Sequence, residues 1–219
     1  MRYIKMKMLF RRLFLYFKNM KWMVLIPLIM ADVLVPILAY FSYIVEDIDF
    51  VTVVMLSSYI LIPLSSCIWS LFILKEYVEG KGNELLYVGK NKVKLLDCLI
   101  PFLLFFVTII IQFSFYIKID NVFKFEIIRM FFVCFLYFSL TYCFAFLTKS
   151  IPLTLMALII YDVLNVVFGL RMKNAFLIYY SVNPFNQTVF YSQILAIFLL
   201  SLALLGAGIL LNKHISKFN

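Results

Sequence analysis

Six apolar runs, each long enough to cross a lipid bilayer, constrain the fold of this chain more than any other feature. Of its 219 residues, 65% are hydrophobic and 14% are charged, and its mean hydropathy is +1.04. Soluble domains are about half apolar and about a quarter charged, whereas a spanning helix needs about 20 mostly apolar residues. We therefore predict an all-α membrane protein with six transmembrane helices, at about 22–45, 50–74, 93–117, 127–148, 151–170 and 193–211.

The form of these runs argues against a β-barrel, because they lack the alternation of barrel strands. Only residues 149–152 separate the fourth run from the fifth, and Pro152 suits the first turn of a helix. The last run contains Gly206 and Gly208, and small residues allow two helices to approach closely.

The distribution of Lys and Arg predicts the orientation. With six spans and both termini on one side, 15 of the 20 Lys and Arg residues lie on that side, and the other five are Lys118, Lys124, Arg129, Arg171 and Lys173. Because Lys and Arg are enriched on the cytoplasmic side, we expect a multi-pass protein of the cell membrane with cytoplasmic N- and C-termini.

Residues 1–21 predict an amphipathic helix that lies in the membrane surface, ahead of a six-span domain at 22–219. Apolar residues recur at steps of three and four, as in a helix with one apolar face. Basic residues flank that face and would contact anionic headgroups; they include Lys7, Arg11, Arg12 and Lys18. The alternative is an ordinary basic flank of the first span.

Two ionisable residues fall well inside predicted spans. Asp32 lies in the first span and Asp162 in the fifth, with Asn165 one turn after Asp162. A carboxylate near the bilayer midplane costs about 2.5–3.5 kcal/mol on insertion scales, so both should face the bundle or a wet cavity. They are either a proton or substrate site, or hydrogen-bonded groups that hold helices together.

The sequence carries no recognisable catalytic or metal-binding motif. The four cysteines are scattered without a C-x-x-C pair, and there is one histidine, so a disulfide framework or a metal site has little to build on. The glycines near Lys90 lack the spacing of a phosphate loop. We therefore expect no enzyme activity, no metal and no cofactor in this chain.

A polar island separates the second and third runs. It contains Glu76, Glu79 and Glu84, together with Gly80 and Gly82. The glycines permit a sharp turn, and Asn83 can cap a new helix that has Glu84 in its first turn and an apolar face at Leu85 and Leu86. We predict a short cytoplasmic helix within about 76–90; a solvated loop is the alternative.

The pattern Glu76-x-x-Glu79-Gly80-x-x-x-Glu84-Leu85-Leu86, followed by a basic turn and the next span, resembles the coupling-helix region of type-2 ABC exporter permeases. The six spans, the amphipathic N-terminus and an Asn-Pro-Phe segment before the last span are similar too. The chain departs from the family at Tyr87, where family members often have a proline after the Glu-Leu-Leu run.

The resemblance implies a permease subunit that pairs with a second permease subunit, identical or related, on cytoplasmic ATPase subunits. ATP and Mg²⁺ would bind those partners, and the island residues Glu76, Glu79, Gly80, Gly82, Glu84, Leu85 and Leu86 would contact the ATPase. The aromatic content of 19% and the few polar residues in the spans favour amphipathic or hydrophobic cargo, such as peptides. The alternatives are a substrate-capture subunit of a vitamin-uptake transporter and a non-transporting immunity or assembly protein.

Overall fold

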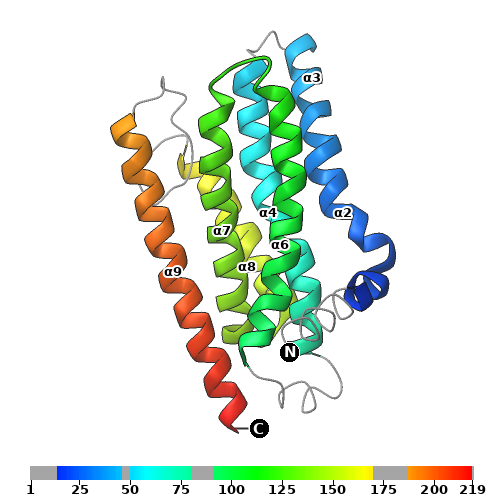
Figure 1. Cartoon of the computed structure of the whole chain (residues 1–219), viewed down its shortest axis with the longest axis vertical. Coiled ribbons are helices and arrows are strands. Elements are labelled where there is room, and N and C mark those ends of the chain that lie inside the picture. Colours follow the sequence, from blue (N-terminus) through cyan, green and yellow to red (C-terminus); the bar gives the residue numbers. More distant parts are fainter. Residues whose placement is uncertain (1–13, 46–49, 80–90, 170–186, 219) are drawn as a thin grey trace, which may run out of the picture.

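The computed structural model describes residues 14–45, 50–79, 91–169 and 187–218, and within these ranges the chain is helical apart from short turns at 117–122 and 149–150 and the last residue of the second range (Figure 1). Residues 14–20 are helical. The elements that follow are a 3₁₀ turn η1 (Lys21–Val24), α2 (Leu25–Leu28), a π-helix η2 (Ile29–Leu34), α3 (Val35–Val45), α4 (Phe50–Val78), α6 (Asn91–Tyr116), α7 (Phe123–Thr148), α8 (Ile151–Gly169) and α9 (Gln187–Phe218).

Among the described residues, five helical segments are long and apolar enough to cross a membrane, which is consistent with a multi-pass membrane protein: Phe14–Ile44, Phe50–Val78, Lys94–Tyr116, Phe123–Thr148 and Gln193–Lys213. The sixth helix, α8, has 19 residues. At 1.5 Å per residue this length is about 29 Å, close to the thickness of the hydrocarbon core. The structure thus confirms an all-α protein of six helices.

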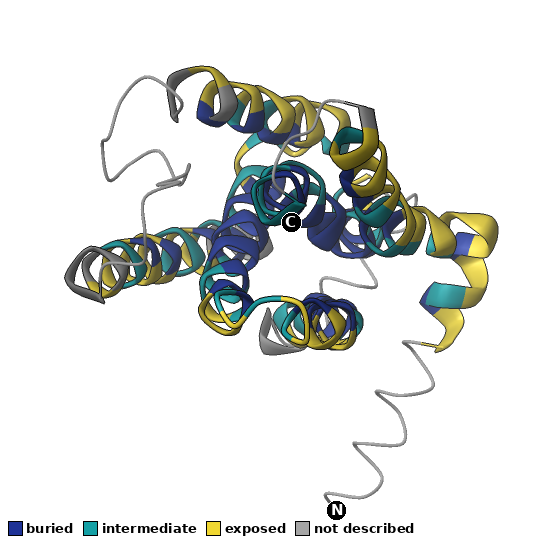
Figure 2. Ribbon diagram, turned by 90° about the horizontal axis from the view of Figure 1, so that it is seen from above, coloured by how far each residue is buried: buried dark blue, intermediate teal, exposed yellow. Residues whose placement is uncertain are grey.

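The helices α4 and α7 form the centre of the bundle, with the other helices around them (Figure 2). Buried residues concentrate on these two helices, and exposed apolar residues cover the outer faces of α3, α8 and α9. Aromatic side chains fill much of the space between α6 and α7; the Phe102 ring, for example, lies 5.1 Å from that of Phe138. Apolar outer faces are what lipid contact requires.

The two ends of the bundle are called here the lower and upper ends, as drawn in Figure 1. Residues 14–20, the end of α4, the start of α6 and the end of α9 lie at the lower end. The turn between α6 and α7 lies at the upper end. Both ends of the described chain therefore lie at the same end of the bundle.

The first span is less regular than its sequence predicts. Lys21 has a φ of 49°, which breaks the helix between residues 14–20 and α2. Pro36 has no N–H to bond to the carbonyl of Asp32 in an α-helix, and the helix takes the wider π turn across Ile29–Leu34 just before it.

The short connection between α7 and α8 is the tight hairpin that the sequence predicts. Lys149 adopts the left-handed conformation with a φ of 52°, and its N–H bonds to the Ala145 carbonyl. The α8 helix then begins at Ile151, with Pro152 in its first turn.

The close approach of helices expected at the last span occurs at one glycine. A Cβ atom on Gly208 would lie 2.8 Å from the Tyr142 ring and 3.1 Å from the Cα of Cys143 in α7. Gly206 faces open space, with nothing within 4 Å of an added Cβ. Gly208 therefore sets the spacing of α7 and α9.

Candidate functional site

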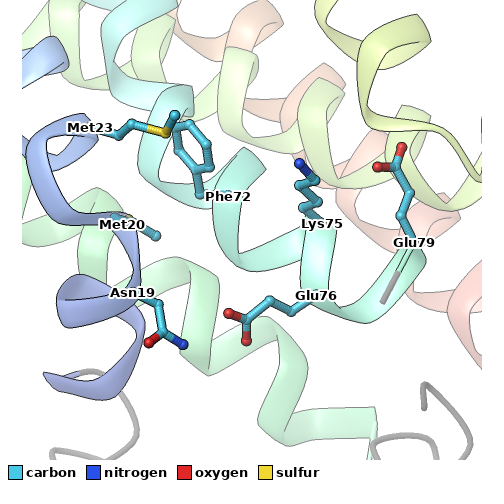
Figure 3. A pocket seen from close by; sticks show the side chains of 7 residues that line it. All are labelled: Asn19, Met20, Met23, Phe72, Lys75, Glu76 and Glu79. Carbon is cyan, nitrogen blue, oxygen red and sulfur yellow. The ribbon is translucent and has the colours of Figure 1, made fainter. Parts of the chain in front are cut away.

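A groove at the lower end separates residues 14–20 and η1 from the end of α4. We call it the lower groove; its volume is about 380 Å³, and the side chains labelled in Figure 3 line it. Glu76 is directed toward Asn19 across the groove, and Met20, Met23 and Phe72 supply its apolar part. The mixed lining can accept a partner that offers both polar and apolar groups.

An apolar cavity of about 400 Å³ adjoins the lower groove along the same face of α4. The two share Phe72, Lys75 and Glu79. Ile26 and Ile68 line this second cavity, as do Ile151, Pro152 and Leu155 of α8. The two hollows thus lie next to each other at the end of α4, and Lys75 and Glu79 line both of them.

A hydrogen-bonded chain joins the end of α4 to its neighbours. The hydroxyls of Tyr16 and Tyr77 lie 3.1 Å apart, and Tyr77 donates to the Asp97 carboxylate of α6 at 2.7 Å. All three side chains are buried. Because buried polar groups are costly to leave unpaired, this chain fixes residues 14–20, α4 and α6 relative to one another.

Glu79 makes a second connection, to α8. Its carboxylate accepts a hydrogen bond from the backbone N–H of Ile151 at 2.6 Å. This N–H is one of those that a helix start leaves without a partner, and a negative charge there is also favourable for the helix dipole. Glu79 therefore fastens the last residue of the described α4 segment to the α7–α8 hairpin.

A third buried network ties α6 to α7 and α9. The Lys94 ammonium donates to Asn212 at 3.3 Å, and the Asn212 amide donates to the Tyr142 hydroxyl at 3.1 Å. Lys94 also lies over the Tyr77 ring, 5.7 Å from its centroid. The lower ends of these helices consequently form one polar layer.

Several residues predicted for this end lie outside the described residues. They are the island residues Gly80, Gly82, Glu84, Leu85 and Leu86, and the membrane-surface residues Lys7, Arg11 and Arg12. The predicted short helix at about 76–90 is described only through Glu79, and most of the surface helix at 1–21 is likewise outside. Lys18 is exposed, while Tyr16 and Met20 of the same turns are buried against the bundle.

Asp162 and Asn165, predicted as intramembrane polar residues, are buried and hydrogen-bonded. Tyr137 of α7 donates to the Asp162 carboxylate at 2.6 Å. The Asn165 amide donates to the Tyr161 carbonyl at 2.9 Å. Asp162 thus joins α7 to α8, while Asp32 lies apart from it, between the first span and α6.

A buried ion pair is a further polar contact, besides those of Lys94 and Asp97, that the sequence did not predict. Glu126 and Arg129 form an ion pair at 3.4 Å near the upper end, and Tyr59 of α4 donates a hydrogen bond to Glu126. The spacing of three residues between the two charges was the available signal, since such residues neighbour each other on a helix. The hydrogen bond from Tyr59 had no such signal in the sequence, because it depends on how α4 packs against α7.

No protein-family model, curated protein or solved structure matches the chain. Within the described residues, no group of three or more His, Cys, Asp or Glu side chains could hold a metal ion. The function must therefore be argued from the arrangement of the chain itself.

Proposed function

We propose that this chain is the transmembrane permease subunit of an ATP-driven exporter, with ATP hydrolysis on separate cytoplasmic subunits. In this proposal two permease subunits pair, and the lower end faces the cytoplasm. The cargo is amphipathic or hydrophobic, such as a peptide. The resemblance of the polar island to a coupling-helix region motivates the assignment.

The observation that carries the proposal is the connection of the end of α4 to several other helices. Tyr77 bonds to residues 14–20 and to α6, and Glu79, two residues on, bonds to α8. A force applied to the segment that follows Glu79 would act on all of these elements together. Coupling between sites requires such contiguous physical contacts, and an ATPase that docks on the island could use them.

The positive charge of the lower end supports the orientation. Exposed or partly exposed lysines at that end include Lys18, Lys21, Lys75 and Lys149. The cytoplasmic side of membrane proteins is enriched in Lys and Arg. The apolar outer faces of the helices support cargo that enters from the lipid rather than from water.

The proposal is tested by charge reversal in the lower groove. Glu76→Arg should reduce the ATPase activity of the complex, reconstituted with candidate ATPase subunits, by about tenfold, because a misplaced charge at a docking surface costs of the order of 1.4 kcal/mol or more. Lys124→Glu, an exposed charge reversal at the upper end, is the matched control and should leave the activity unchanged.

Failure would be clear in two ways. If none of the candidate ATPase subunits forms a complex with the chain, the permease assignment is wrong. If a complex forms but Glu76→Arg and Lys124→Glu behave alike, the lower groove is not the docking site.

A further inference from the structure

A third cavity, of about 370 Å³, lies between the first span and α6. Asp32 and Pro36 line it from one side, and Thr108, Gln112 and Tyr116 line it from α6. Residues four apart on a helix lie on one face, so the two helices present facing rows of polar and aromatic groups. Ile111 and Phe115, which are 56% and 62% exposed, form its mouth toward the lipid-facing surface.

Two hydrogen-bond acceptors are left over at this cavity. Asp32 Oδ1 and Gln112 Oε1 are both buried and have no hydrogen-bond partner among the described residues. The Thr108 side chain interacts with the Asp32 carboxyl group and also donates to the Phe105 carbonyl at 2.8 Å, so Oδ1 is the Asp32 oxygen that has no partner. Buried acceptors of this kind are rare and costly, and both of them call for a donor.

The orientation of the Gln112 amide is fixed by its neighbours. Its nitrogen donates to the Ala31 carbonyl at 3.0 Å and to the Tyr116 hydroxyl at 3.3 Å. A flipped amide would set its oxygen against the Ala31 carbonyl oxygen, which cannot donate. The oxygen of Gln112 therefore remains available as an acceptor.

The backbone of the first span is irregular at this cavity. Asp32 lies in the π-helix η2, next to the Ala31 carbonyl that Gln112 holds. Single π turns within α-helices occur frequently at functional sites. The irregular turn, the cavity and the unpaired Asp32 oxygen therefore coincide at one point of the first span, and Gln112 lines the same cavity from α6.

We propose that this cavity is a binding site for the ammonium group of an amphipathic amine that enters from the lipid. Asp32 supplies the negative charge that balances the ammonium, and Gln112 supplies a second hydrogen-bond acceptor. The alkyl chain of the bound ligand extends past Ile111 and Phe115 into the bilayer. The Phe115 and Tyr116 rings add aromatic faces, which attract cations. Phe115 carries one such contact already, because the Lys118 ammonium lies 5.6 Å from its ring centroid.

The chemistry of the lining favours an organic cation over other ligands. Asp32 is the one ionisable carboxyl among the residues that line the cavity, so a divalent metal ion would lack ligands. An anion would meet two acceptors and a negative charge. The volume lies within the range of small-molecule sites, and the site requires no ATPase partner.

Binding of radiolabelled dodecylammonium to the full-length chain in phosphatidylcholine nanodiscs tests the proposal, with empty nanodiscs as background. We expect saturable binding that excess dodecanol does not displace. Asp32→Asn should weaken the affinity about tenfold or more, because hydrogen bonds to charged groups are worth more than neutral ones. Ile111→Trp, which fills the mouth but keeps the carboxylate, should weaken it as well.

Asp162→Asn is the matched control. It removes the other intramembrane carboxyl, which Tyr137 already satisfies, and should leave dodecylammonium binding unchanged. Equal binding by the wild type and Asp32→Asn would overturn the proposal, because it would show that binding does not depend on the Asp32 carboxylate. Displacement by dodecanol would overturn it too.

The source of the ammonium group is then decided by lipid composition. If phosphatidylethanolamine in the nanodiscs competes with dodecylammonium, and co-purifies with the wild type but not with Asp32→Asn, the site binds a lipid headgroup. If it does not compete, the site takes free amphipathic amines. Both results support an ammonium site, and they differ only in its occupant.

Discussion

Buried charged residues are the positions at which single substitutions should have the largest effects. Glu126 and Arg129 pair with each other in the upper half of the bundle, and their side chains are only 7% and 11% exposed. Removing one partner leaves an uncompensated buried charge, which typically costs about 3–5 kcal/mol. Arg129→Met should therefore lower the unfolding free energy by about this amount, measured by thermal unfolding in detergent.

The control for this prediction lies on the same helix. Lys124 is exposed, so Lys124→Met should change the stability by no more than about 0.5 kcal/mol. If both variants unfold at the same temperature, the ion pair contributes little. Arg129→Met together with Glu126→Gln should recover much of the loss, because the second change removes the unpaired charge.

Sequence reasoning at this scale could identify some of the buried polar residues but few of their partners. Asp162 was predicted to face the bundle because a carboxyl inside an apolar run is costly in lipid. That Tyr137 would satisfy it depends on how α7 and α8 pack. The same holds for Tyr77 and Asp97, which are 20 residues apart in the chain and meet only in the folded bundle.

At the scale of elements, α7 and α9 should be the pair most sensitive to side-chain size. Gly208→Ala would bring a Cβ to within 2.8 Å of Tyr142 and 3.1 Å of the Cys143 backbone, so the helices must move apart. Overpacking of this kind costs about 1–3 kcal/mol. We expect a lower melting temperature for this variant.

Gly206→Ala is the matched control, because nothing lies within 4 Å of the added Cβ. Alanine is a better helix former than glycine by up to about 1 kcal/mol, so this variant should be unchanged or slightly more stable. A similar loss in both variants would show that glycine flexibility, and not helix spacing, matters in α9.

The positions of the helices could be predicted from the sequence, because spanning helices are set mainly by apolar length. Their ends were less accurate: α9 begins at Gln187 and α7 at Phe123, several residues before the predicted starts. Polar and interfacial residues can extend a helix beyond the hydrocarbon core, so hydropathy underestimates its length. The π turn of the first span was missed, although Pro36 was its visible signal.

At the scale of the whole molecule, the charge distribution predicts how the bundle sits in the membrane. Counted along the sequence with six predicted spans, 15 of the 20 Lys and Arg residues fall on the side of the two termini and five on the other side. A membrane orients such a chain with its richer side in the cytoplasm. In the proposed orientation, residues 14–20 lie at the inner membrane surface, where the exposed Lys18 can meet anionic headgroups.

Cysteine labelling of intact cells tests this orientation. Asn121→Cys, at the exposed turn between α6 and α7, should react with a membrane-impermeant maleimide without permeabilisation. Lys18→Cys should react only after the membrane is opened, because it lies at the other end of the bundle. The wild-type chain gives the background, since its cysteines are buried or partly buried. The reverse pattern would place the polar island outside the cell, where no ATP-driven partner could reach it, and would refute the exporter proposal together with the orientation.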